Sequence, residues 1–276
     1  MSLDPGLTAA YADAADGFMN VARLAAADPA SWDHPTECPG WTVGDVVAHV
    51  VGLERDLDGW PRPEHELPAD LPHVTSELDR WMEVPVDLRR GRPPSGVLAE
   101  LEEVLPQRKA TVAELVATGE DVELAGLGGV LTRAARLLPM RVLDLWAHEQ
   151  DIRRALGIEG HLACPAADTT AALIRSTLPE VVATRAAVGP GNVVRLVVEG
   201  QTALQAVVEV RGNGRGELVD PRGRHGVPTV DIDLDWETLV RLACGRVSYA
   251  DVAEDIYLEG NRAAGVAILN NLALTP

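Results

Sequence analysis

The hydrophobic periodicity of this chain changes near residue 160, and that change limits the folds open to it. Before this point, apolar residues recur every three or four positions over four long stretches, which is the spacing of amphipathic helices. The stretches span residues 7–27, 42–60, 96–118 and 131–156. Because each would bury one apolar face, residues 1–160 are predicted to form a four-helix bundle.

After residue 160 the pattern shifts toward short runs of β-branched residues, separated by turn signals at hairpin distance. Strands are expected at 192–199, 203–210 and 227–234, and helices at 165–186, 235–242 and 261–273. Residues 161–276 are therefore predicted to form a small α+β domain with an antiparallel sheet. The whole chain is predicted to be an α+β protein of two domains.

Proline and glycine mark the breaks between these elements. Residues 28–40 and 61–74 have the composition of irregular loops, and the second loop could cover a binding site as a lid. Residues 75–90 could form a further helix with an interruption at Pro85. Pro106 is expected to kink the helix that contains it, because proline removes a backbone donor.

The chain is strongly acidic, which excludes several classes of partner. Asp and Glu number 42 against 24 Lys and Arg, for a formal net charge of −18. Such a field repels nucleic acid and anionic membranes, so neither is expected as a partner, and an anionic substrate would need a local cluster of basic residues. The cysteines, Cys38, Cys164 and Cys244, form no CxxC pair, which fits a reducing cytoplasm. No apolar run reaches membrane-spanning length and the first residues lack the basic character of a signal peptide, so a cytoplasmic location is expected.

Two histidines and one aspartate fall at positions that could hold a metal ion. His49 lies three and four residues from apolar neighbours on its predicted helix and so faces inward. Asp144 and His148, four residues apart, project from one face of another helix. Three N and O ligands suit a catalytic zinc with one open coordination position, and Asp151 could hydrogen-bond the imidazole of His148. The same spacing also fits histidines that are satisfied within an ordinary core.

The remaining chemical candidates are weaker. The glycine-rich segments at 126–129 and 212–216 lack the context of a phosphate-binding loop and are better explained as turns. Cys38 precedes the helix of His49 and could lie near the metal. We expect core packing for Trp41 and Trp146. Solvation is expected for three loop histidines, His34, His65 and His73.

Two segments resemble the diagnostic segments of the mycothiol-dependent maleylpyruvate isomerase family. They are WDHPTECPGWTVGDVVAHVVGLERDLDG at 32–59 and RVLDLWAHEQDIRRALG at 141–157. The resemblance implies a DinB-like metal-binding bundle, with zinc or another divalent metal such as nickel held by His49, Asp144 and His148. The family has Glu at the acid position, and the shorter Asp here demands a closer helix or a slightly shifted ion. The segment TLVRLACGR at 238–246 resembles the family's C-terminal domain, which is similar to sterol-carrier proteins.

The resemblance also implies an activity. In the isomerase, the metal stabilises the thiolate of mycothiol, which adds to a cis double bond so that rotation and elimination give the trans isomer. Other members of the wider group transfer the thiol to electrophiles. An anionic substrate would be bound by arginines, for which Arg141, Arg241 and Arg246 are the candidates. Ion pairs with Asp151 or with acids of the second domain are expected for Arg153 and Arg154.

The sequence leaves two function classes open. The first is an enzyme that acts on a small-molecule substrate with a metal-activated thiol cofactor, either an isomerase or an S-transferase. The alternative is a non-catalytic metal- or small-ligand-binding protein with the same fold. A structural dimerisation module is a weaker third possibility, and the oligomeric state is not indicated by any pattern.

Overall fold

A computed structural model describes residues 2–223 and 225–274, which form two compact units. The units divide between Thr169 and Thr170. This division falls inside helix α7 (Pro165–Glu180). The boundary predicted from the sequence, after residue 160, lies just before that helix.

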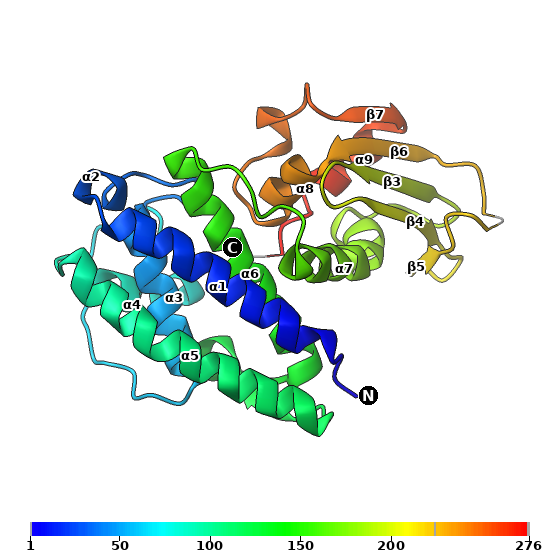
Figure 1. The fold of residues 1–276 in the computed structure, drawn as a ribbon. Coiled ribbons are helices and arrows are strands. Elements are labelled where there is room, and N and C mark those ends of the chain that lie inside the picture. The colour runs from blue at the N-terminus through cyan, green and yellow to red at the C-terminus, as the bar shows by residue number, and fades with distance from the viewer. Residues whose placement is uncertain (1, 224, 275–276) are drawn as a thin grey trace. The chain divides into compact units, whose positions relative to one another are not determined.

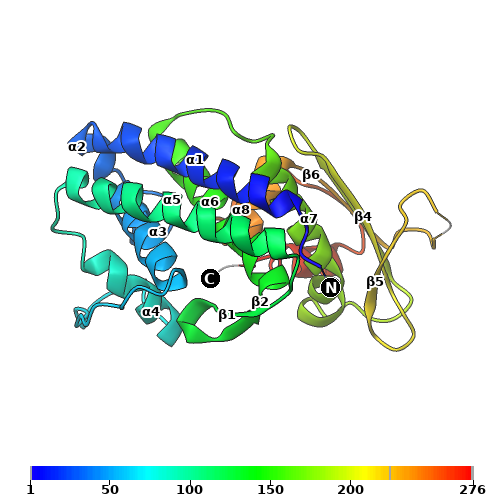
Figure 2. The same ribbon diagram turned by 60° about the horizontal axis from the view of Figure 1, so that its bottom comes forward.

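Four long helices make up most of the first unit. They are α1 (Gly6–Ala26), α3 (Val43–Leu57), α5 (Pro94–Thr118) and α6 (Ala134–Leu156). Helix α1 packs against α5 and α6, and α3 packs against the same two helices (Figures 1 and 2). The predicted four-helix bundle is therefore confirmed. The short helices α2 (Pro29–Trp32) and α4 (Glu77–Asp87) pack beside α3.

Local signals in the sequence determine where α3 begins and where α6 ends. The side chain of Thr42 accepts a hydrogen bond from the backbone N–H of Asp45, and the Asp45 carboxylate accepts one from the N–H of Thr42. This reciprocal cap satisfies two backbone donors that a helix start leaves unpaired. Helix α6 ends at Gly157, whose φ of 63° lies in the left-handed region that glycine adopts without a steric penalty.

Prolines lie inside helices α4 and α5. Helix α4 continues through Pro85, so the predicted interruption there is wrong. Pro85 has no N–H for the carbonyl of Trp81 one turn earlier, and the guanidinium of Arg62 donates to that carbonyl instead. Helix α5 runs from Pro94 to Thr118 with Pro106 inside it, and the kink expected at Pro106 stays a prediction.

A small hairpin occupies the start of the predicted fourth helix. Strands β1 (Glu123–Ala125) and β2 (Leu131–Arg133) pair in antiparallel register around a tight turn at Leu127–Gly129. The helical prediction for residues 131–133 is therefore wrong. The glycines at the turn allow the chain to reverse, and Leu131 points outward with 67% exposure, so no core contact draws these residues into α6.

The second unit is a five-stranded sheet with helices. Its strands are β3 (Val193–Glu199), β4 (Leu204–Val210), β5 (Gly216–Val219), β6 (Val230–Asp235) and β7 (Tyr257–Gly260), in the order β5-β4-β3-β6-β7. Strands β3 and β6 are parallel and the other pairs antiparallel, so the expected antiparallel sheet is in fact mixed. Along the chain, β4 and β5 come between β3 and β6. The chain then returns to the end of the sheet where β3 starts, and β6 begins there beside β3. Strands β5 and β7 were not predicted.

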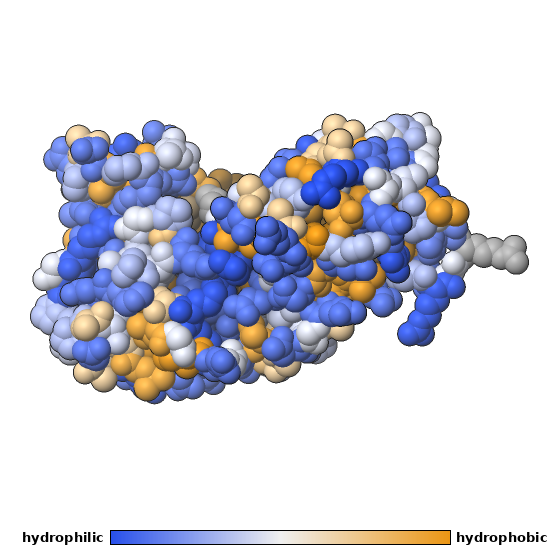
Figure 3. Space-filling view, turned by 90° about the horizontal axis from the view of Figure 1, so that it is seen from above, coloured by the Kyte–Doolittle hydropathy of each residue, from blue (hydrophilic) through white to orange (hydrophobic). Residues whose placement is uncertain are grey.

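Helices of the second unit bury one face of this sheet. Apolar side chains of β3, β4 and β6 meet those of α7 and α9 (Arg262–Leu269) in the core. A wide helical turn (Val181–Arg185) extends α7. Helix α8 (Trp236–Ala243) begins after Asp235, whose side chain accepts the backbone N–H of Thr238, and a short turn follows at Tyr249–Asp251. Among the described helices, none combines the length and apolar character needed to cross a bilayer. Most residues on the face drawn in Figure 3 are hydrophilic.

Candidate metal centre

His49 lies on the buried face of α3, as its position among apolar residues predicts. Its side chain is 3% exposed, and neither ring nitrogen has a hydrogen-bond partner among the described residues. The ring of Trp41 packs beside it at 4.9 Å between centroids. A buried imidazole without partners is costly, so the arrangement favours a ligand that can satisfy a ring nitrogen.

Asp144 and His148 of α6 face His49 across the bundle. Asp144 Oδ2 lies 3.7 Å from His49 Nε2, and Asp144 Oδ1 lies 3.8 Å from His148 Nε2. One donor atom from each of the three residues lies within 4.8 Å of the others. These separations are too long for hydrogen bonds, whereas zinc bonds of about 2.0–2.2 Å place neighbouring ligand atoms roughly 3.3–3.6 Å apart. The three side chains therefore fit around one shared cation.

The electrostatics of the cluster keep its groups ready to bind a cation. Burial lowers the pKa of His49, an effect larger than the opposing influence of the Asp144 carboxylate. Burial alone would raise the pKa of Asp144, but the guanidinium of Arg141 and the imidazole of His148 hold it well below its usual range. A neutral imidazole and an ionised carboxylate are the forms that coordinate metals.

A buried charge network holds Asp144 in place from the side of α6. Arg141 Nη1 lies 2.9 Å from Asp144 Oδ2, and its Nη2 donates to Glu54 Oε1 at 2.6 Å. Glu54 also accepts hydrogen bonds from Tyr11 Oη at 2.6 Å and from Arg108 Nε at 3.0 Å. The guanidinium of Arg141, a substrate-binding candidate in the sequence, is committed to two carboxylates here, a position that suits orientation of Asp144.

The far side of the His148 ring is held by polar neighbours. Asp151 Oδ2 lies 3.0 Å from His148 Nδ1, which is the contact expected from the sequence. The Cys38 thiol donates to the same carboxylate oxygen at 3.1 Å and lies 3.9 Å from His148 Nδ1. Arg154 pairs with Asp151 Oδ1 at 2.7 Å and with Glu37 at 2.8 Å. This layer directs His148 Nε2 toward Asp144.

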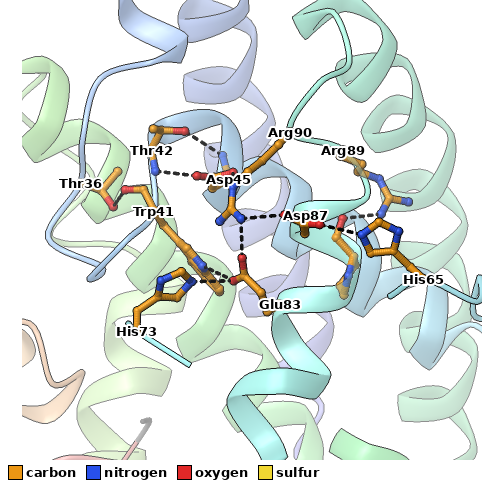
Figure 4. A network of polar contacts seen from close by, with 11 residues as sticks. Thr36, Trp41, Thr42, Asp45, His65, His73, Glu83, Asp87, Arg89 and Arg90 are labelled. Carbon is orange, nitrogen blue, oxygen red and sulfur yellow. Dashed lines mark hydrogen bonds and ion pairs between the residues drawn. The ribbon is translucent and has the colours of Figure 1, made fainter. Parts of the chain in front are cut away.

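Helix α4 and the 61–74 segment form a further polar layer around Trp41 (Figure 4). Glu83 Oε2 accepts a hydrogen bond from Trp41 Nε1 at 2.8 Å and lies 3.0 Å from His73 Nε2, while Glu83 Oε1 pairs with Arg90 Nη1 at 2.6 Å. His65 Nε2 lies 2.7 Å from an oxygen of Asp87.

These contacts correct the prediction that His65 and His73 are solvated. Their side chains are 25% and 15% exposed, and carboxylates of α4 tie them down. His34 is exposed, as expected. The 61–74 segment is thus bound to α4 by His65 and His73, in addition to the Arg62 contact with the Trp81 carbonyl.

The other predicted arginines lie outside this cluster. Arg153 pairs with Glu149 at 2.6 Å on its own helix. Arg241 lies in α8, and Arg246 follows that helix in the second unit. Arg246 lines a hollow of about 330 Å³ together with Tyr249 and residues of the C-terminal segment.

Sequence reasoning missed two buried acids, Glu54 and Glu83. Both are less than 2% exposed and organise the polar layers behind the metal cluster. The only signal for Glu54 in the sequence was its position directly after the apolar stripe of α3. The partners of Glu54 come from three other helices. No pattern in the sequence shows such convergence.

A four-helix bundle with an inward-facing His/Asp/His cluster, followed by a mixed sheet, defines a two-part α+β protein with a candidate metal centre. The family model of the mycothiol maleylpyruvate isomerase N-terminal domain matches residues 14–153, half of the chain. The chain belongs to this family, and the resemblance stated from its sequence is confirmed.

Two solved structures are similar to this chain in fold. One is the mycothiol-dependent maleylpyruvate isomerase, with a TM-score of 0.55, 15% identity, and coverage of 94% of this chain and 93% of that one. The other is a histidine-to-alanine mutant of that enzyme, at 16% identity with the same TM-score and coverage. Among curated proteins, none matches the chain significantly. At these identities the likeness supports the fold alone.

Proposed function

We propose that this protein is a metal-dependent enzyme that uses a low-molecular-weight thiol, mycothiol, on a small electrophilic substrate. The metal is zinc, or another divalent ion such as nickel, held by His49, Asp144 and His148. The reaction is an isomerisation like that of the related isomerase, or transfer of the thiol to the substrate. Membership of the family supports the reaction class, and the geometry of the cluster supports the metal.

One observation carries the proposal. His49 is fully buried, both of its ring nitrogens lack hydrogen bonds to any described residue, and it faces a carboxylate and a second imidazole at distances that suit a shared ion. Core histidines are normally hydrogen-bonded. Three ligands that leave room for a fourth are the arrangement of a catalytic rather than a structural zinc.

Each surrounding residue has a role that its contacts define. Asp151 orients His148, Arg141 fixes the carboxylate of Asp144, and the ring of Trp41 covers the imidazole of His49. When bound, the cation supplies a Lewis acid that stabilises a thiolate near neutral pH. The neighbouring side chains keep the ligands in fixed positions, so little reorganisation is needed.

Recognition of an anionic substrate requires positive charge against a net charge of −18. Arg141 is already paired with Glu54 and Asp144. Within the second unit Arg246 lines a hollow, and we propose it before Arg241 as a residue that binds the anionic group of a substrate. An Arg246→Ala variant should raise KM for an anionic substrate while metal content stays unchanged. Unchanged kinetics would exclude Arg246 from substrate binding.

Metal analysis of the purified protein tests the first part of the proposal. His49→Ala and His148→Ala should each lose one equivalent of metal relative to the unmodified chain. His34→Ala is the matched control, since His34 is an exposed loop histidine, and its metal content should not change. Equal metal content in all four proteins would overturn the assignment.

A thiol-transfer assay tests the second part. The metal-loaded protein, mycothiol and a model electrophile should give a thioether, or maleylpyruvate should be converted to its trans isomer. Both activities should disappear in His49→Ala. A protein that binds metal but neither binds mycothiol nor turns over would be the non-catalytic binding protein that the sequence left open.

A further inference from the structure

A second group of metal-ligand side chains lies away from His49, within the first unit. Asp13 belongs to α1, His161 to the segment between α6 and α7, and Cys164 directly precedes α7. One donor atom from each lies within 4.8 Å of the other two. We propose that these three residues bind a second divalent cation of the zinc type.

The donor set matches the chemistry of zinc. A thiolate, an imidazole and a carboxylate are its three usual protein ligands, and a water molecule can complete the tetrahedron. Asp13 Oδ1 lies 3.3 Å from His161 Nε2. This is the separation that two bonds of about 2.0 Å at a tetrahedral angle produce. The side chains of His161 and Asp13 are 21% and 26% exposed, so an ion can enter from solvent.

The ring of His161 is oriented for coordination by an outer carboxylate. Its Nδ1 lies 2.7 Å from Glu149 Oε2, and Glu149 is fully buried with its other oxygen held by Arg153 Nε at 2.6 Å. A carboxylate on one ring nitrogen leaves the opposite nitrogen to bind a metal, which is the usual outer arrangement of metal-bound histidine. Here that opposite nitrogen faces Asp13.

The backbone is shaped around this group. His161 has a φ of 61°, in the left-handed region that residues other than glycine rarely adopt. Gly17 lies one helical turn after Asp13, and a Cβ there would overlap the Glu149 carboxylate and lie 2.7 Å from His161 Cε1. The absence of a side chain at Gly17 lets His161 and Glu149 reach α1.

The sulfur of Cys164 is also held in place. It accepts the backbone N–H of Ala167 at 3.4 Å in the first turn of α7, so it occupies the position of a helix cap. On binding, the thiol releases its proton to solvent and the metal–sulfur bond forms. The cation would join α1, the α6–α7 segment and the start of α7, three segments that are distant in sequence.

Cobalt titration of the metal-free full chain tests this site independently of the His49 cluster. Co²⁺ bound by a thiolate shows a sulfur-to-metal charge-transfer band, and the His49, Asp144 and His148 cluster contains no thiol. We expect the band in the unmodified protein and in His49→Ala, and its loss in Cys164→Ser. Serine is a preferred helix cap, so the variant should fold.

The control is Cys38→Ser, because Cys38 lies near His148. The band should persist in that variant, and Cys164→Ser should lose one equivalent of zinc while His49→Ala loses the other. The affinity of Asp13→Asn for Co²⁺ should fall by more than the roughly 10–100-fold caused by loss of an outer partner. Absence of a sulfur band from the unmodified protein, or a band that disappears with Cys38, would overturn the proposal. In that case His161 is an imidazolium paired with carboxylates, and the proposed function is unaffected.

Discussion

The buried carboxylate of Glu54 neutralises two guanidinium groups, and Glu54→Gln should therefore destabilise the first unit strongly. The glutamine keeps the size of the side chain but removes its charge. Arg141 and Arg108, 2% and 5% exposed, would then lose their shared buried counterion. Removing one partner of a buried ion pair typically costs about 3–5 kcal/mol of unfolding free energy. Arg141 retains Asp144 and Arg108 retains Asp58, so we expect a value near the lower limit.

Urea unfolding followed by tryptophan fluorescence measures this change in the right part of the molecule. Five of the six tryptophans precede residue 170, and only Trp236 lies in the second unit. The matched control is Glu102→Gln, which removes a carboxylate from an exposed pair with Arg23 at 2.8 Å. An exposed pair contributes about 0–1 kcal/mol. A Glu54→Gln loss no larger than that of the control would refute the reasoning.

The pH dependence of the same comparison follows from the pKa of Glu54. Burial would raise this pKa, but Arg141, Arg108 and the hydrogen bond from Tyr11 together lower it. A carboxyl group whose pKa is lower in the folded state adds stability above its unfolded pKa of about 4.3, and this contribution is lost as the pH falls through the folded value. The stability difference between the unmodified protein and Glu54→Gln should therefore be constant near neutrality and narrow in acid. A difference that widens in acid would contradict the charge argument.

Three further predictions concern packing and the metal. Gly52→Ala should lower the unfolding free energy by about 1–3 kcal/mol, because the added Cβ would overlap the ring of Pro85; unchanged urea unfolding would show that α4 can move aside. Asp151→Asn should weaken zinc affinity about 10–100-fold, since it removes the carboxylate that orients His148. Competition with a chromophoric chelator measures this affinity, and an unchanged value would show that Asp151 does not orient His148 for zinc binding. Removing the metal with a chelator should lower the thermal midpoint of unfolding, because a ligand at 100 times its Kd stabilises the folded state by about 2.7 kcal/mol. The shift should be smaller in His49→Ala. An equal shift in both proteins would show that the stabilising metal is not bound by His49.

The helices were predictable because their signals are local. A period of 3.6 residues fixes which face of α3 is buried, and this periodicity alone places His49 on the inward side of the helix. The capping pair of Thr42 and Asp45 marks the start of α3. The hairpin at β1 and β2 was missed because its strands have three residues each, too few for a periodic pattern.

The mixed sheet could not be derived from the strand patterns. Alternation of apolar and polar residues identifies β3 and β6 as strands. It does not indicate which strands pair with them in the sheet, or whether a pair is parallel or antiparallel. The parallel pairing of β3 with β6 depends on where the chain returns after β5. Residues 220–229, between β5 and β6, are mostly polar with two glycines and two prolines, and their sequence does not specify the path of the connection.

The sequence by itself determined most helices and strands of this protein and which face of each long helix is buried. It placed His49 on the buried face of its helix, and Asp144 and His148 on one face of another helix. Tertiary structure alone decided that His49 stands 3.7 Å from Asp144, that Glu54 meets two arginines, and that Asp13, His161 and Cys164 converge. The physical reason is that helical periodicity fixes directions about one axis. The distance and rotation between two helices result from the packing of all their side chains together.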